Sequence, residues 1–120
     1  MRGEQYLTKK EQFDSVYKRG SNWANKNLVI RVLPNNLEIS RFGITVSRRV
    51  GKAVVRNRIK RLIRETVRKI PFNPGYDIVF IARVSVAEAR YSQVEESIKG
   101  LLDKAGLLTG EYEGISSRAD

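Results

Sequence analysis

Residues 54–70 decide the fold, and they read VVRNRIKRLIRETVRKI. Apolar side chains recur there every three or four positions, which is the period of one buried helix face. Pro71 follows directly and cannot continue a helix. The spacing therefore predicts a helix over 54–70 whose apolar face packs on a core. The residues on that face are Val55, Ile59, Leu62, Ile63, Val67 and Ile70.

The opposite side of this helix is cationic. Ten basic residues and one acidic residue, Glu65, lie between Arg48 and Lys69. Like charges four residues apart destabilise an isolated helix by about 0.2–0.5 kcal/mol per pair, so a bound polyanion would relieve the repulsion. A helix of about 3.6 residues per turn turns these side chains away from the core: Arg58, Lys60, Arg61, Arg64 and Arg68.

Two other interpretations of this face are open. A solvated face of an amphipathic helix is usually charged, but it then mixes both signs. A helix lying on a membrane surface needs an apolar face that is free, whereas this one is predicted to join a core. The net charge is +10 overall, +13 in residues 1–70 and −3 in residues 71–120. So localised an excess of one sign favours a nucleic-acid partner.

The flanking sequence predicts a sheet. Residues 76–82 form an unbroken apolar run after a Pro-Gly turn, which indicates a strand buried on both faces at the centre of the sheet. Residues 28–33 are rich in β-branched side chains and end at a turn, so they predict another strand. Residues 37–39 and 43–47 then predict one return strand or two short ones, which pair with it in antiparallel fashion.

Two capping boxes predict the remaining helices. Thr8 and Glu11 are spaced to start a helix over about 9–19, with Gly20 suited to a left-handed stop. Ser92 and Glu95 are spaced to start a last helix that ends near Gly106. The predicted fold is therefore α+β, a single domain over 1–108 in the order αβββαβα, with helices on one mostly antiparallel sheet. Residues 109–120 read as a polar, disordered tail.

Composition narrows the chemistry. The chain has no Cys and no His, which excludes thiolate and imidazole metal ligands, Cys nucleophiles and His bases. The carboxylates of the first 70 residues form no convergent motif, so neither a metal site nor a catalytic side chain is expected. No apolar run approaches the roughly 18 residues of a membrane span, and the N-terminus lacks the apolar core of a signal peptide. A cytoplasmic protein without membrane contact is expected.

The spelling of residues 43–65, GITVSRRVGKAVVRNRIKRLIRE, resembles the signature of the bacterial ribonuclease P protein subunit. Its R-N-R core is present as Arg56-Asn57-Arg58. The likeness extends upstream through residues 7–25 and downstream through residues 77–83, and it covers about residues 5–107. A lone R-N-R tripeptide is weak evidence, but the whole block in a strand-loop-helix context is specific.

The resemblance implies a left-handed βαβ crossover, an exception to the usual right-handed rule. It also implies an accessory subunit without a catalytic side chain, whose partners are a catalytic RNA and precursor tRNA. The RNA removes the 5′ leader with Mg2+ that it mainly holds itself, and no obligate protein partner is evident. The residues that resemble the RNA-contacting set are Arg48, Arg49, Lys52, Arg56, Asn57, Arg58, Lys60, Arg61 and Arg64.

The same resemblance places the single-stranded leader in a cleft between the first helix and the sheet, on a different face from the cationic helix. Phe13 and Tyr17 are four residues apart and share a helix face, where they can stack on bases at about 1–3 kcal/mol per base. The spacing by itself favours core packing for both. Arg31 stands where relatives often carry another cleft aromatic, and it is expected to contact a leader phosphate. Two roles stay open for Trp23, a further stacking surface or a loop anchor.

Two rival functions share the charge pattern. A structural RNA-binding protein of the ribosomal type needs no leader cleft, and a free-standing protein nuclease needs its own catalytic groups. Cleavage assays with protein alone, RNA alone and both together separate the three.

Overall fold

The helix predicted from the quoted stretch is α2, which runs from Ala53 to Lys69. The structure is a computed structural model that describes residues 6–108. Its other elements are α1 (Lys10–Arg19), β1 (Ser21–Ala24), β2 (Leu28–Pro34), β3 (Arg41–Thr45), β4 (Tyr76–Ala82) and α3 (Tyr91–Lys104), with short 3-10 helices η2 (Arg48–Val50) and η3 (Val84–Glu88). The α+β class and the αβββαβα order are confirmed. The predicted tail, residues 109–120, lies outside the described residues.

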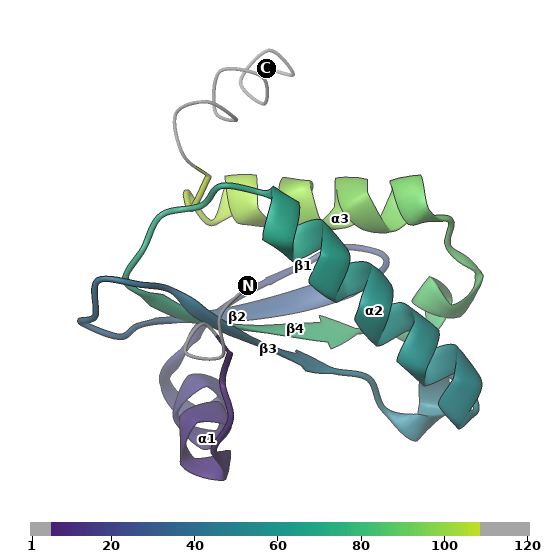
Figure 1. Ribbon diagram of the computed structural model, residues 1–120, viewed down its shortest axis with the longest axis horizontal. Coiled ribbons are helices and arrows are strands. Elements are labelled where there is room, and N and C mark those ends of the chain that lie inside the picture. Colours follow the sequence, from purple (N-terminus) through teal and green to yellow (C-terminus); the bar gives the residue numbers. More distant parts are fainter. Residues whose placement is uncertain (1–5, 109–120) are drawn as a thin grey trace.

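The four strands form one mixed sheet in the order β1-β2-β4-β3. The β1–β2 and β2–β4 pairs are antiparallel, and the β3–β4 pair is parallel. α2 therefore connects two neighbouring parallel strands, and the left-handed sense of that crossover stays a prediction from the resemblance. α2 and α3 cover one face of the sheet, and α1 lies against the other (Figure 1).

β4 occupies the central position that its apolar run predicts. Ile78 and Phe80 are fully buried in the main core, together with side chains of α2 and α3. Val79, one residue along, is fully buried on the opposite face with Val16 of α1. Since side chains alternate along a strand, a strand covered by helices on both faces reads as a continuous apolar run.

The predicted antiparallel pairing of residues 28–33 with residues 37–39 and 43–47 is wrong. β2 pairs with β1 and β4 and does not touch β3 through a ladder, and residues 37–39 form bends instead of a strand. The Asn35 side chain accepts a hydrogen bond from the Leu37 amide at 2.8 Å, and Asn36 adopts a left-handed φ of 61°. These Asn residues turn the chain away from β2, which frees that edge for β4.

The strand that the sequence analysis missed is β1, residues 21–24. It is short and polar, so it carries little of the alternation that marks a strand. Its Trp23 lies opposite Ile30 of β2 and packs against the main core, which is the anchoring role.

Both predicted capping boxes are wrong in detail. The amides of Thr8 and Lys9 donate to Oε1 of Gln12, at 2.8 and 2.9 Å, so Glu11 is not used. At α3, the Arg90 amide donates to Oε1 of Gln93 at 2.8 Å. In each case a Gln three residues into the helix takes the part that the prediction gave to Glu.

Gly20 ends α1 for a different reason than predicted. Its φ is −76°, so it is not left-handed. A Cβ at this position would lie 2.5 Å from the Val16 carbonyl oxygen of α1 and 3.1 Å from the Val32 carbonyl oxygen of β2, so the crowding at the end of α1 is what requires glycine.

A buried ion pair fixes the sheet on the α1 side. Arg41 donates to both carboxylate oxygens of Asp77, at 2.9 and 2.7 Å, and Asn35 donates to one of them at 2.9 Å. The hydrogen bond to Asp77 raises the pKa of Arg41. Asp77 is only 5% exposed, and these three hydrogen bonds satisfy its carboxylate oxygens.

Candidate nucleic-acid interface

The predicted RNA-contacting residues form one surface, here called the cationic surface: η2, the loop that follows it and the outer side of α2. The structure exposes Arg48, Arg49, Lys52, Asn57 and Arg61. It half-buries Arg56, Arg58, Lys60 and Arg64. None of the basic members forms an ion pair with a carboxylate within residues 6–108. Their charge is therefore uncompensated by the described part of the chain.

The two arginines of the R-N-R core also hold the surface together. Nη1 of Arg56 donates to the Gly51 carbonyl at 2.9 Å, which ties α2 to the preceding loop. Nη2 of Arg58 donates to the Ala87 carbonyl at 2.9 Å, which ties α2 to η3. A guanidinium has five N–H donors, so each arginine keeps donors for a phosphate while it positions its neighbours.

A hollow of about 230 Å3 joins the cationic surface to α1 across the edge strand β3. The Phe13 ring lies directly against Gly43, where a Cβ would be 2.4 Å from the ring. Lys60 and Arg64 line the same hollow, so the expected leader residues and the expected RNA contacts adjoin at β3. The complete lining is Tyr6, Leu7, Phe13, Phe42, Gly43, Ile44, Lys60 and Arg64.

Phe13 and Tyr17 share a face of α1 but differ in surroundings. Phe13 is half-buried and packs against a small cluster that contains Val16 and Val79. Tyr17 is 38% exposed, and its hydroxyl is hydrogen bonded to Oγ1 of Thr45 at 2.9 Å. Phe13 thus combines core packing with one wall of the hollow, whereas Tyr17 presents its ring to solvent.

Arg31 is committed to the end of α1. Its guanidinium donates to the carbonyls of Tyr17 at 2.6 Å, Gly20 at 3.1 Å and Val16 at 3.3 Å. The Val16 carbonyl also accepts a hydrogen bond from the Gly20 amide at 2.8 Å. The last carbonyls of a helix have few backbone donors, and a cation near a helix C-terminus is favourable. Arg31 therefore positions α1 and Tyr17, and its expected contact with a leader phosphate stays a prediction.

Four residues that the sequence analysis missed form a strip on the α1 face of the sheet. The register places Ala24 beside Val29, Val29 beside Ile81, and Ile81 beside Thr45. All four are exposed or half-buried. This open strip begins where Tyr17 contacts Thr45, and only the strand register, which the sequence does not spell out, brings its members together.

Arg68 was also left out of the predicted set, although it was predicted on the cationic face. It is exposed, and Nη2 donates to the Tyr6 hydroxyl at 3.2 Å. Its four-residue spacing from Arg64 was the available signal.

Comparison with known proteins decides the family, because residues 1–106 match the ribonuclease P family. The chain belongs to the ribonuclease P protein family. The ribonuclease P protein component of Dehalococcoides mccartyi strain CBDB1 is 43% identical over 114 residues, which is 95% of each chain. The component from Clostridioides difficile strain 630 is 48% identical over 104 residues, or 84% of this chain and 91% of the relative.

Solved ribonuclease P proteins share the fold. The Staphylococcus aureus protein superposes with a TM-score of 0.80 at 33% identity, covering 88% of this chain and 98% of that one. The Thermotoga maritima protein has a TM-score of 0.75 at 33% identity, covering 82% and 96%. The resemblance seen in residues 43–65 is thus confirmed.

As a ribonuclease P protein component, the chain is part of a tRNA-processing enzyme and works with RNA. The cationic surface fits that role. The comparisons give no support to the alternative of a ribosomal-type structural protein. Within residues 6–108 no helix is long and apolar enough to cross a membrane.

Proposed function

We propose that this chain is the accessory subunit of a ribonucleoprotein ribonuclease P. In this enzyme the RNA cleaves precursor tRNA, and the protein binds the catalytic RNA and positions the 5′ leader. The cationic surface binds the catalytic RNA, and α1 with the open strip binds the 5′ leader of precursor tRNA. The observation that carries the proposal is the cationic surface itself, because its basic side chains have no carboxylate partner in residues 6–108. RNA phosphates are the natural counterions of such a surface.

The arginines suit this task. Arginine outnumbers lysine seven to three between Arg48 and Lys69. Its planar fork makes paired hydrogen bonds to phosphate and also stacks on bases, which a lysine ammonium does not do. Because Arg56 and Arg58 are anchored to backbone carbonyls, part of the surface is held in position before the RNA arrives.

Leader binding rests on a smaller set. Tyr17 offers an exposed ring on which a base can stack, and the open strip that begins at Thr45 has no charged member. Arg31 keeps that ring in place through the end of α1. The leader therefore meets a fixed aromatic side chain, with Lys60 and Arg64 across β3 for its phosphates.

Magnesium belongs to the RNA in this proposal. Residues 6–108 contain no group of three or more Asp or Glu side chains placed to hold a metal ion. When bound, the ions supply the activated water and stabilise the leaving oxygen, and the products are a 5′-phosphate on the tRNA and a 3′-hydroxyl on the leader. The protein lowers phosphate repulsion around the site. The proposal places the protein in the cytoplasm, with RNA as the only partner it requires.

Reconstitution tests the proposal. Cleavage of precursor tRNA is measured at low magnesium with the protein alone, a bacterial ribonuclease P RNA alone, and both together. We expect cleavage only with both, and slow cleavage by the RNA alone when magnesium is raised. Cleavage by the protein alone would favour a protein nuclease. Absence of stimulation by correctly folded protein would reject the accessory role.

A further inference from the structure

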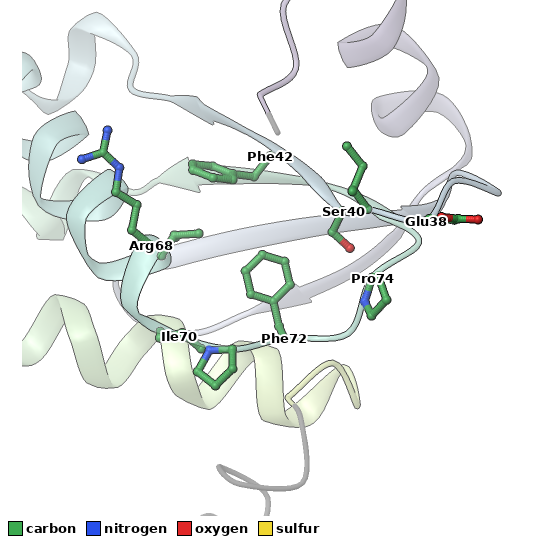
Figure 2. Close-up of a pocket in the computed structure, with 10 residues that line it drawn as sticks. Glu38, Ser40, Phe42, Arg68, Ile70, Phe72 and Pro74 are labelled. Atoms are coloured by element: carbon green, nitrogen blue, oxygen red, sulfur yellow. The ribbon is translucent and has the colours of Figure 1, made fainter. Parts of the chain in front are cut away.

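A second hollow, here called the Phe72 groove, lies beside the cationic surface at the far end of α2. It measures about 450 Å3 and is bounded by the end of α2, the start of β3 and the segment 70–74. The Phe72 ring rises from that segment toward Phe42 on the opposite side (Figure 2). The apolar lining includes Ile39, Phe42, Val67, Ile70 and Phe72.

The ring of Phe72 is held in place by its backbone. Phe72 forms an antiparallel bridge with Leu108, and the Asn73 amide donates to the Leu107 carbonyl at 2.7 Å. Phe72 itself is half-buried, so one part of the ring packs on the core and another part faces the groove. A pre-positioned and partly exposed aromatic ring is a stacking platform.

A row of cations leads to this platform. Lys60, Arg64 and Arg68 follow each other at four-residue intervals, each about 6 Å further along α2. Lys60 and Arg64 line the hollow at β3, Arg68 lines the Phe72 groove, and Phe42 lines both. The three cations therefore lie beside two hollows that share Phe42 in their lining.

The acidic groups near the groove do not oppose this row. Glu38 is the one carboxylate among the lining residues, and its side chain points away from the hollow (Figure 2). Arg68 forms no ion pair within residues 6–108. Lys69 is turned to α3, where its ammonium donates to the Tyr91 hydroxyl at 3.2 Å.

We propose that the Phe72 groove binds an unpaired RNA segment, with one base stacked on Phe72 and the adjoining phosphates on Arg68 and Arg64. The inference rests on the proposed function and adds a second single-strand site to it, on the face of the sheet opposite α1. Double-stranded RNA does not fit, because its bases are already stacked and paired. An apolar peptide would contact the apolar lining residues but would leave the row of cations without partners.

Binding of a single-stranded hexa-adenylate to the full chain tests the groove directly. With Ile and Val methyl groups labelled for NMR, we expect saturable shifts at Ile39, Val67 and Ile70. Phe72→Leu should weaken the affinity by about tenfold, within the range for one lost base–aromatic stack. Phe72→Tyr keeps the ring and should bind like the parent chain. Unshifted groove methyl groups, or equal affinity of the Leu and Tyr variants, would overturn the proposal.

Charge and folding are controlled separately. Arg68→Gln should reduce the affinity and lower the salt dependence by the share of about one phosphate, roughly 0.7 in the log–log slope. Lys104→Gln also removes one positive charge, but from the exposed end of α3, and it should leave the affinity and the salt dependence unchanged. If Phe72→Leu does not fold, the Arg68→Gln and Lys104→Gln pair still decides, since equal behaviour of those two variants would refute the groove.

Two further arms identify the source of the RNA and separate this inference from the proposed function. Loss of affinity in Phe72→Leu for ribonuclease P RNA assigns the groove to the catalytic RNA, and loss that depends on leader length assigns it to the precursor.

If the parent chain stimulates cleavage while Phe72→Leu binds every RNA as well as the parent chain does, the groove inference alone fails. If stimulation is absent while Phe72→Leu still loses hexa-adenylate, the proposed function alone fails. If an acidic peptide shifts the signals of the groove methyl groups and none of the RNAs does, the groove would be reassigned to a protein partner.

Discussion

α1 and α2 are both amphipathic helices of the candidate nucleic-acid interface, but they are held to the sheet in different ways. α2 buries Ile59, Ile63, Thr66 and Val67, whereas α1 buries Val16 alone. α1 depends instead on polar contacts, among them Arg31 at its end and the hydrogen bond between Tyr17 and Thr45. The helix that carries the cationic surface is therefore packed into the main core, whereas the helix that carries the expected leader residues buries few apolar side chains.

The difference teaches how one small domain combines a fixed RNA platform with an adjustable one. Regions with few buried apolar contacts open at lower free energy than the core. We therefore expect α1 to exchange its amide hydrogens faster than α2. An element that opens at low cost can adapt to leaders of different sequence, whereas the contact with one catalytic RNA needs no such freedom.

The largest expected effect comes from replacing buried side chains of the two core clusters by alanine. Ile63→Ala on α2 should lower the free energy of unfolding by about 2–5 kcal/mol, because it leaves a cavity in a closely packed core. Val16→Ala on α1 should cost about 2 kcal/mol or less, since it removes two methyl groups from a small cluster. Urea denaturation measures both. Equal costs would remove the contrast between the two helices.

Next in size is the loss of charge from the cationic surface. Replacing Arg56, Arg58 and Lys60 together by Ala should weaken binding to ribonuclease P RNA and flatten its salt dependence by about 0.7–0.9 in the log–log slope for each lost phosphate contact. Binding isotherms over a series of salt concentrations measure the slope.

A control with two charges removed outside the cationic surface keeps this result specific. Arg90→Gln with Lys104→Gln removes two exposed charges from the ends of α3 and should leave the slope unchanged. An unaltered slope in the triple variant would show that its side chains serve the fold and do not contact phosphate.

Much of α2 could be predicted because its information is local. The apolar period, Pro71 and the one-sided charge all lie within the quoted stretch, and they gave the helix and the cationic surface together. The apolar run of 76–82 likewise gave β4 and its central position. Such features depend on near neighbours in the chain, so a sequence contains them directly.

The rest of the site is set by contacts between distant residues. The pairing of β2 with β4 instead of β3, and hence the open strip beside Thr45, depends on which strands meet in the sheet. The role of Arg31 follows from the end of α1 lying over β2, which no spacing reveals. An arginine on a strand reads as an exposed charge, while its hydrogen bonds to three carbonyls appear only in three dimensions.

Arg31→Gln should produce a smaller effect that is confined to α1. Loss of a charged donor to the end of a helix costs about 1–3 kcal/mol, and here the cost should fall on α1 before the whole fold. Hydrogen exchange should show faster exchange in residues 10–19 with little change in α2. Arg19→Gln, an exposed change at the end of the same helix, is the control. Uniformly faster exchange over the whole domain would instead mean that Arg31 supports the global fold.

The smallest expected effect separates the ring of Tyr17 from its hydroxyl. Tyr17→Phe loses the hydrogen bond to Thr45, which is worth about 0.5–1.5 kcal/mol, but it keeps the stacking surface, so affinity for leader-bearing precursor should fall only slightly. Tyr17→Leu loses the ring as well and should weaken leader binding further, by up to the 1–3 kcal/mol of about one stacked base. Affinities for precursor and mature tRNA, measured with the reconstituted enzyme, give the comparison. Because only the precursor has a leader, a loss that is equal for both RNAs would mean that Tyr17 supports α1 and does not touch the leader.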